Sequence, residues 1–510
     1  MKDFRKEAQN FLKNETEFHL GFLPSEARNP LTMTLDQDFR RATAEGVLTL
    51  LSCDSALLPY FREVLKRPEY AAMIEAVRRA RRVIFSGCGA TGRLAILLES
   101  AWNEVHPDDL RVLSIMTGGD FALIRSVENF EDYPAVGRKQ ADELGITADD
   151  VLIGITATGE TASIIGSALE ASERGAAVFM LICVPRELPS SRLERCRKLY
   201  SRPNVTVIDM QIGGMALTGS TRMQSSTIEF LVAASALEAA SDSPGIDYAA
   251  AFEQLLDSLH TAHSISGIAR CIDFENEVYL HHGLIDYEAD DLQIDILSDT
   301  TERSPTFMIP PYKFLDDPVS AEPWAMLRDP VRSNQEIWEI CLKRPLRCIS
   351  WTPADYEAAG LSALIKKGVP QIDAESLYRI PLGGFAPGRK NARRVVFRNQ
   401  PDGPLSIGNQ LIGSGTVKTP LRLFEHLRMK LVMNIISTGT MVKFGRVKSN
   451  YMIHLAISNK KLIDRACRII AELCGLSYEE ACVELFRTWS EVPPGSSPVA
   501  VTLERLEKRM

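Results

Sequence analysis

The sequence lacks any long uninterrupted apolar run. No stretch of its 510 residues is apolar enough over a sufficient length to cross a bilayer. The first residues, MKDFRKEAQNF, also lack the apolar core that a secretion signal requires. We therefore expect a cytoplasmic protein with no membrane partner.

Metal-ligand spacing and basic character are missing as well. The ten cysteines contain no CxxC pattern, and the paired histidines have no Cys or carboxylate beside them at ligand spacing. We interpret the cysteines as reduced thiols and expect no metal or organic cofactor. The net charge is −8 and no long basic run occurs, so we expect no nucleic-acid partner.

The sequence does contain a regular alternation of apolar strands and helices, preceded by about 80 mainly helical residues. Strands are expected at 82–86, 111–117, 151–156, 177–184 and 205–210. Helices are expected at 92–103, within 122–144, and at 161–174, 192–200 and 221–240. This alternation predicts an α/β fold with a parallel sheet covered on both faces. Ligands of such sheets bind at the carboxyl ends of the strands.

Three of these strand ends carry glycines and hydroxyl residues. The runs are GCGATGR at 87–93, TATGET at 156–161 and LTGSTRM at 217–223. Each precedes an expected helix, whose free N–H groups and dipole favour an anion. Together they predict a polar ring suited to a sugar phosphate. There is no GxxxxGK[ST] run, and GCGATG departs from GxGxxG, so a nucleotide site is not indicated.

The three loops resemble those of the sugar isomerase (SIS) domain. More narrowly, they are similar to the loops of the N-acetylmuramic acid 6-phosphate etherase and glucokinase regulatory protein group, which hold the phosphate and hydroxyls of an amino- or keto-sugar phosphate. The substrate-binding residues that this resemblance implies are Gly89, Thr91, Thr156, Thr158, Thr161, Ser220 and Thr221. The simpler role for each hydroxyl is to cap a helix, and that role is compatible with ligand contact.

Two acidic residues match the catalytic acids of the etherases. The run SVENFED, 126–132, resembles the family's EGAED run and aligns Glu131 with one acid. The other acid of the single-domain etherases lies in a D-A-S-E-C-P-P-T-F run. Here DTTERSPTF, 299–307, matches that run with Glu302, whereas the corresponding position of the first copy is Ala101. The resemblance thus implies a fused pseudo-dimer in which the second copy supplies Glu302 to the loops of the first. A solvated helix end is the alternative for this run.

The expected organisation is two flavodoxin-like, parallel-sheet SIS domains and a C-terminal helical lid. The parts are the N-terminal helices with the first SIS domain at 1–245 (the first copy), a degenerate SIS domain at 246–433 (the second copy) and the lid at 434–510. The run SDSPGID, 241–247, is the expected linker. In the second copy we expect a helix at 249–268, strands at 277–282, 346–350 and 394–397, and no second set of phosphate loops.

The longest close match to the etherase group spans 428–470. Within it Lys430 aligns with a family lysine that reaches the sugar phosphate, a task that suits an ammonium group. Three residues depart from the usual loop pattern: Ala90, Glu160 and Gln224 stand where the etherases have Thr, Arg and Lys. These departures leave open a different sugar phosphate or a loss of catalysis.

The resemblance implies a carbon–oxygen lyase of amino-sugar metabolism that eliminates D-lactate from an N-acetylmuramic acid 6-phosphate. Two carboxyl groups, Glu131 and Glu302, would act as acid and base, in an order that the sequence leaves open. Two alternatives remain. One is a non-catalytic sugar-phosphate sensor that regulates a partner such as a sugar kinase, and the other is a sugar-phosphate isomerase. The sequence also leaves open whether the pseudo-dimer forms a homo-oligomer.

Overall fold

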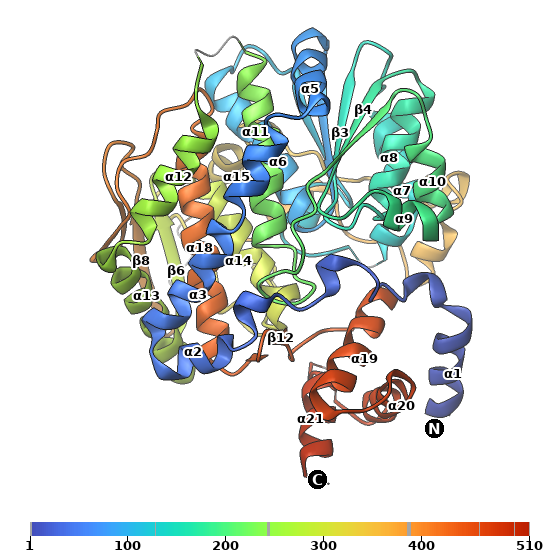
Figure 1. Ribbon diagram of the computed structural model, residues 1–510, viewed down its shortest axis with the longest axis vertical. Coiled ribbons are helices and arrows are strands. Elements are labelled where there is room, and N and C mark those ends of the chain that lie inside the picture. The colour runs from blue at the N-terminus through green and yellow to red at the C-terminus, as the bar shows by residue number, and fades with distance from the viewer. Residues whose placement is uncertain are drawn as a thin grey trace.

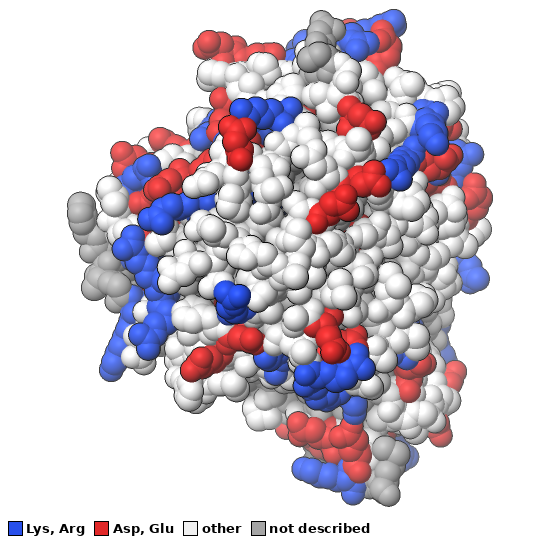
Figure 2. Space-filling view, turned by 60° about the vertical axis from the view of Figure 1, so that its left-hand side comes forward, with Lys and Arg blue, Asp and Glu red and all other residues white. Residues whose placement is uncertain are grey.

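The computed structural model describes residues 3–127, 129–241, 245–384, 389–457, 459–493 and 495–508. It contains two five-stranded sheets, which lie side by side, and a smaller helical body attached at one end (Figure 1). Within the described ranges, no helix is both long and apolar enough to cross a membrane. On the face drawn in Figure 2, acidic and basic side chains are interspersed around a broad area without charged side chains.

The first sheet is parallel throughout and has the strand order β2-β1-β3-β4-β5. Its strands are β1 Val83–Gly87, β2 Val112–Met116, β3 Val151–Ile155, β4 Ala177–Ile182 and β5 Val205–Asp209. β1 and β3 are buried at every position, because helices cover both faces of the sheet. These strands confirm the five that the sequence predicts, and their carboxyl ends meet along one edge.

The helices of the first copy connect these strands and cover the sheet. They are α1 Phe4–Asn14, α2 Leu35–Arg41, α3 Thr43–Ser55, α4 Leu58–Val64, α5 Pro68–Arg79, α6 Ala90–Val105, α7 Pro134–Glu143, α8 Ala162–Glu173, α9 Glu187–Arg192, α10 Glu194–Tyr200 and α11 Gln224–Ala239. α6 begins at Ala90, within the first of the three glycine- and hydroxyl-rich loops, and α8 and α11 begin directly after the second and the third. The first turns of these helices therefore lie at the edge where the strands end.

The second sheet repeats only part of the first and has the order β10-β9-β8-β6-β7. Its strands are β6 Leu284–Ala289, β7 Ala325–Leu327, β8 Ala392–Arg398, β9 Leu405–Ile407 and β10 Gln410–Ile412. β6 pairs in parallel with β7 and β8, as β1 does with β2 and β3. After β8, however, the chain forms the antiparallel β9–β10 hairpin instead of a crossover helix. The second copy therefore has no counterpart of the second and third loops.

The helices of the second copy surround this sheet. They are α12 Tyr248–Leu259, α13 Ala262–Leu280, α14 Gln293–Phe307, α15 Asn334–Leu342, α16 Pro353–Ala358, α17 Ala374–Tyr378 and α18 Leu423–Lys443. α14 follows β6 as α6 follows β1, so α14 and α6 are counterparts. α18 is buried along nearly its whole length and packs against α3, α13 and α14.

Several sequence-based expectations for the second copy are wrong. Residues 277–282 end helix α13 instead of forming a strand, because the three apolar residues of EVYLHH are too few to separate the helix period from the strand period. Residues 346–350 form no strand: the carbonyl of Arg347 accepts a hydrogen bond from the Asp120 amide, in a loop of the first copy. The helix expected at 249–268 is two helices, α12 and α13. Of the expected linker, residues 242–244 lie outside the described residues.

The expected lid boundary after residue 433 falls inside α18, so we place the beginning of the lid after that helix. The lid consists of the hairpin β11 Val447–Lys448 and β12 Tyr451–Met452 and the helices α19 Lys460–Cys474, α20 Tyr478–Trp489 and α21 Pro498–Glu507. α1 packs against α20, so both ends of the chain share one helical body (Figure 1). Its core includes Phe11, Ile470 and Leu485.

A buried ion pair fastens the lid to the first copy. The Glu26 carboxylate is 4% exposed and accepts hydrogen bonds from Arg465, at 2.5 and 3.1 Å, and from Arg468, at 2.7 Å. Burial alone raises the pKa of Glu26, but the two arginines outweigh it and lower the pKa from 4.5 to about 2. A carboxylate removed from water in this way stabilises the fold only while it stays ionised.

We expect acid to weaken this attachment. Because the pKa of Glu26 is lower in the folded state, the stabilisation is fully present above the unfolded pKa and is lost as the pH falls from about 4.5 towards 2. Between about pH 6 and pH 3, the wild type should lose about 2 kcal/mol more unfolding free energy than Glu26→Gln. Urea unfolding at each pH measures this difference, and equal losses in the two proteins would contradict it.

Candidate functional site

A cavity of about 340 Å³ lies where the three loops meet at the carboxyl edge of the first sheet. We call it the main cavity. The residues of the three loops that line it and that the sequence predicts are Gly89, Thr91, Thr156, Thr158, Thr161, Ser220 and Thr221. Both predicted acids, Glu131 and Glu302, line it too. The structure therefore brings together every predicted site residue except Lys430.

The first loop is closed by its own residues. The Thr91 hydroxyl accepts a hydrogen bond from the Cys88 amide and donates one to the Cys88 carbonyl, each at 3.0 Å. Gly87 has no room for a side chain, since a Cβ there would lie 2.3 Å from the Thr91 backbone. At Gly89 there is room for a side chain, but its left-handed backbone, with φ +57°, favours glycine. No side chain caps the N-terminus of α6. Thr91 thus shapes the loop, and the first N–H groups of α6 stay available to a ligand.

The second loop explains the unusual Glu160. The Thr156 and Thr161 hydroxyls lie 3.0 Å apart and line the main cavity, whereas Glu160 does not line it. The Glu160 carboxylate accepts hydrogen bonds from Arg195 at 2.7 Å and from the Thr158 hydroxyl at 3.2 Å. Its charge is thus compensated by Arg195, and it does not oppose an anion in the cavity directly.

The third loop connects the first copy to the second. Arg222, which is 2% exposed, donates hydrogen bonds to Asp299 at 2.5 Å and to the Ser437 hydroxyl at 2.9 Å. Its Nε lies 3.5 Å from Glu302. Asp299 and Glu302 belong to α14 and Ser437 to α18, so one guanidinium contacts two segments that lie far from the third loop in the sequence.

Lys430 lies behind the third loop rather than in the main cavity. Its ammonium donates hydrogen bonds to the Arg222 and Met223 carbonyls, at 3.2 and 3.3 Å, and to Thr227 and Asn434. It lines a separate pocket of about 50 Å³ beside Glu302. Burial lowers its pKa to about 8. In this arrangement the Lys430 ammonium supports the backbone of the third loop.

Glu131 reaches the main cavity from the turn at Phe130–Asp132. One carboxylate oxygen accepts a hydrogen bond from Asn459 at 2.9 Å and lies 3.5 Å from the Lys461 ammonium. The other lies 3.7 Å from the Cys88 thiol. The Glu131 charge is the main reason that the pKa of Lys461 is raised, while burial, with a smaller effect of Glu131, raises that of Cys88 to about 12. The lid therefore contributes directly to the surroundings of Glu131.

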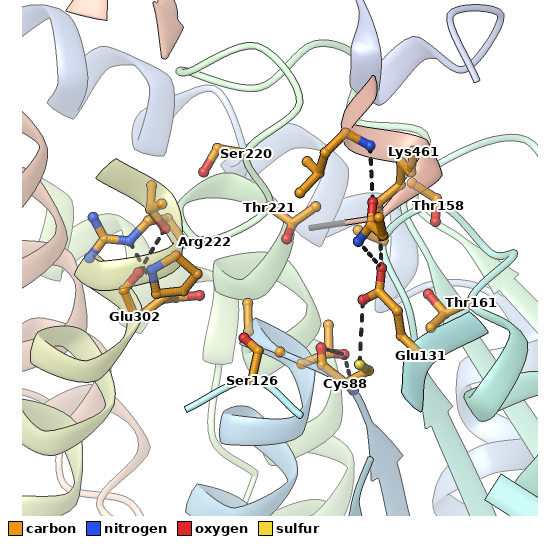
Figure 3. Close-up of a pocket in the computed structure, with 18 of the residues that line it drawn as sticks. Cys88, Ser126, Glu131, Thr158, Thr161, Ser220, Thr221, Arg222, Glu302 and Lys461 are labelled. Atoms are coloured by element: carbon orange, nitrogen blue, oxygen red, sulfur yellow. Dashed lines mark hydrogen bonds and ion pairs between the residues drawn. The ribbon is translucent and has the colours of Figure 1, made fainter. Parts of the chain in front are cut away.

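Glu302 reaches the main cavity from α14 of the second copy. In Figure 3, Glu302 and Arg222 lie on one side and Glu131 with Cys88 on the other, with Thr221 between them. The Glu302 side chain is 13% exposed, and Pro305 and Thr306, one turn further along the helix, also line the cavity. The two carboxyl groups thus face one ligand-sized space from different copies.

Four cationic residues line the main cavity that the sequence analysis did not single out: Arg93, Arg222, Lys461 and Arg465. They stand against three carboxylates, those of Glu26, Glu131 and Glu302. Arg93 and Arg222 belong to the loop runs GCGATGR and LTGSTRM, so the sequence motifs could have identified them. The other two come from α19. Among the described residues, no group of three or more His, Cys, Asp or Glu side chains is arranged to hold a metal ion.

The fold and the cavity define a SIS-type α/β protein with a helical lid, and two family models agree. The model described as the glucokinase regulatory protein N-terminal SIS domain matches residues 67–172. The model described as the C-terminal lid domain of glucokinase regulatory protein matches residues 449–497.

Curated relatives then give the family. The N-acetylmuramic acid 6-phosphate etherase of Mesorhizobium japonicum is 33% identical over 219 residues, 42% of this chain and 66% of the relative. That of Pectobacterium atrosepticum is 32% identical over 225 residues, 43% of this chain and 69% of the relative. The chain belongs to the N-acetylmuramic acid 6-phosphate etherase family, and it spans about two thirds of the length of the curated relatives that it matches.

The fold also resembles solved structures. Glucosamine-6-phosphate deaminase from Thermotoga maritima is 11% identical, with a TM-score of 0.40, over 80% of this chain and 98% of that one. The C-terminal domain of glucosamine-fructose-6-phosphate aminotransferase from Francisella tularensis is 10% identical, with a TM-score of 0.39, over 78% and 96%.

We expect Gly219→Ala to weaken the binding of N-acetylglucosamine 6-phosphate about tenfold, the cost of losing one charge-assisted hydrogen bond. A Cβ at Gly219 would lie 2.4 Å from Arg465 Nε and push this guanidinium out of place. Titration calorimetry measures the affinity.

Gly213→Ala is the matched control. Gly213 has nearly the same φ as Gly219, +77° against +76°, but a Cβ at Gly213 would have no other atom within 4 Å. Both variants should lose about 1 kcal/mol of stability from left-handed strain. Gly219→Ala should lose more, because Arg465 also binds the buried Glu26, and only Gly219→Ala should lose affinity. Equal affinities would show that Arg465 plays no part in binding.

Proposed function

We propose that the protein is an etherase-like lyase that removes D-lactate from N-acetylmuramic acid 6-phosphate. One observation carries this proposal: two carboxyl groups, Glu131 from the first copy and Glu302 from the second, line a single cavity from opposite sides (Figure 3). Family membership supports the same reaction.

The three loops are suited to hold the phosphate end of the substrate. No side chain caps the N-termini of α6, α8 or α11, so their first N–H groups are free to bind an anion. The Ser220 and Thr221 hydroxyls lie beside them, and the cations Arg93, Lys461 and Arg465 add positive charge. Fixing the phosphate in this way would hold an open-chain sugar in the geometry that elimination requires.

The two carboxyl groups then supply the proton transfers. The C2 proton of the sugar is acidic in the open-chain aldehyde, and a carboxylate takes it. As the C3–O bond breaks, the electron pair of the former C2–H bond forms the C2=C3 double bond. The second carboxyl group protonates the departing ether oxygen, which leaves as the hydroxyl of lactate. Water adds at C3 and a proton returns to C2, which gives N-acetylglucosamine 6-phosphate.

A regulatory function is the second candidate, and a specific observation favours it. Asn459 and Lys461 of the lid already occupy one oxygen of Glu131, at 2.9 and 3.5 Å. A carboxylate engaged in this way suits a site that holds a sugar phosphate and senses it through the lid. Both family models also carry the description of a regulatory protein. In this role the protein would bind a sugar phosphate without turnover and pass the signal to a partner such as a sugar kinase.

We expect Glu131→Gln and Glu302→Gln each to lower the rate of D-lactate release from N-acetylmuramic acid 6-phosphate by about 10²- to 10⁴-fold, because each removes one proton-transfer group. Substrate affinity should change far less, since the loops stay intact. A coupled D-lactate assay gives the rate, and calorimetry gives the affinity. Glu63→Gln, on an exposed part of α4, is the matched control and should keep the wild-type rate.

The regulatory candidate predicts a different result. The wild-type protein would bind the sugar phosphate and release no D-lactate even at high protein concentration. A purified sugar kinase would then bind with an affinity that changes when the sugar phosphate is added, which surface plasmon resonance measures. Release of D-lactate at a rate that depends on both glutamates would reject this candidate.

A further inference from the structure

A second polar cavity, of about 260 Å³, lies at the position in the second copy that corresponds to the main cavity. The correspondence follows from the topology, because β6 and α14 repeat β1 and α6. Residues 290–294, between β6 and the first turn of α14, line this second cavity, as the first loop lines the main one. Ser100 and Glu104 of α6 line it from the other copy, as Glu302 of α14 lines the main cavity.

The second cavity is built for an anion by means other than hydroxyl loops. α14 is fifteen residues long and begins after Leu292, which has a left-handed backbone and gives no side-chain cap. The first N–H groups of α14 therefore face a polar space without an acceptor from a capping residue. Arg332, Lys343 and His426 line the same space and bring positive charge or hydrogen-bond donors.

His426 supplies an independent sign of a ligand. The ring is 2% exposed, lines the second cavity and makes a 2.8 Å hydrogen bond through Nδ1 to Asp295. Within the described residues, Nε2 has no recorded hydrogen-bond partner. Burial raises the pKa of Asp295, and Asp295 raises the pKa of His426 against the effect of burial. When the ring is protonated, Nε2 carries a hydrogen and can donate it to an acceptor in the cavity.

Three carboxylates also line the second cavity, and two of them are compensated by neighbouring cations. Glu104 and Asp291 both pair with Arg422, and Glu104 also lies 3.7 Å from the Lys343 ammonium. Asp290 is exposed at the rim, where solvent screens its charge. Besides these compensated carboxylates, the cavity presents the N-terminus of α14 and the ring of His426.

We propose that this second cavity is a binding site, separate from the main cavity, for a phosphate group carried by a small phosphate ester or present as inorganic phosphate. The phosphate oxygens accept from the first turn of α14 and from His426 Nε2, and Arg332 and Lys343, which also pair with Asp329 and Glu104, add to the attraction. Because α6 and α14 each contact both cavities, a ligand here contacts the same two helices as a ligand in the main cavity.

Amide hydrogen exchange tests this site directly. Inorganic phosphate and glucose 6-phosphate are the probes, and the peptide that covers residues 293–297 is the readout. We expect either probe to protect this peptide in the wild-type protein. Lys343→Glu should weaken the protection about tenfold, as expected for the loss of a charged contact, and Lys66→Glu, the same charge change at an exposed position, should not. His426→Gln, which removes the ring donor, should also weaken it.

The outcomes distinguish a phosphate ester from free phosphate, and they also show when the proposal fails. Stronger protection by glucose 6-phosphate identifies a phosphate ester, and stronger protection by inorganic phosphate identifies the free ion. No protection of residues 293–297 by either probe would overturn the proposal, as would equal protection in wild type and Lys343→Glu. Exchange in the peptide that covers residues 89–94 reports on the main cavity in the same samples. A failure of ligand binding in the main cavity is therefore distinguishable from a failure in the second cavity.

Discussion

The buried contact between Arg222 and Asp299 is the interaction on which the site depends. Both side chains are almost fully buried; Arg222 is compensated by carboxylates of the second copy, whereas Asp299 also pairs with Arg303 of its own helix at 2.7 Å. The arginines Arg303 and Arg222 lower the pKa of Asp299 against the effect of burial, so the carboxylate stays ionised. Removal of Asp299 would leave the buried Arg222 guanidinium with only the more distant Glu302 carboxylate, and an uncompensated buried charge costs about 3–5 kcal/mol. The third loop and α14 are therefore held in one relative position, and Glu302 with them.

The two copies have diverged around this contact. The first copy keeps three loops that end in helix N-termini, whereas the second replaces the corresponding crossovers with the β9–β10 hairpin. The second copy, by contrast, keeps the acid Glu302, whereas the first copy has Ala101 at the matching position. A second buried network, in which Arg344 binds Glu99 at 2.9 Å and Asp120 at 2.6 Å, holds the copies together elsewhere. One composite cavity thus takes its loops from one copy and an acid from the other.

The first sheet was predictable from the sequence because buried parallel strands such as β1 and β3 are continuous apolar runs, and each loop is marked by glycine and threonine. The second copy was not, because the run at 277–282 fits a helix as well as a strand, and the segment at 346–350 bonds to a loop instead of a sheet. Local pattern carries no information about such distant partners. The same limit applies to Lys430. Its match to the family pattern is clear from the sequence, but the sequence does not show that its ammonium binds the carbonyls of the third loop.

The central claim is that Glu131 and Glu302 act together on a substrate held by the three loops. Incubation of the wild-type protein with N-acetylmuramic acid 6-phosphate in D₂O, followed by NMR of the sugar, tests it most directly. The account predicts that D-lactate is released and that the product, N-acetylglucosamine 6-phosphate, carries deuterium at C2. Recovery of the intact substrate with its C2 proton unexchanged would contradict the account.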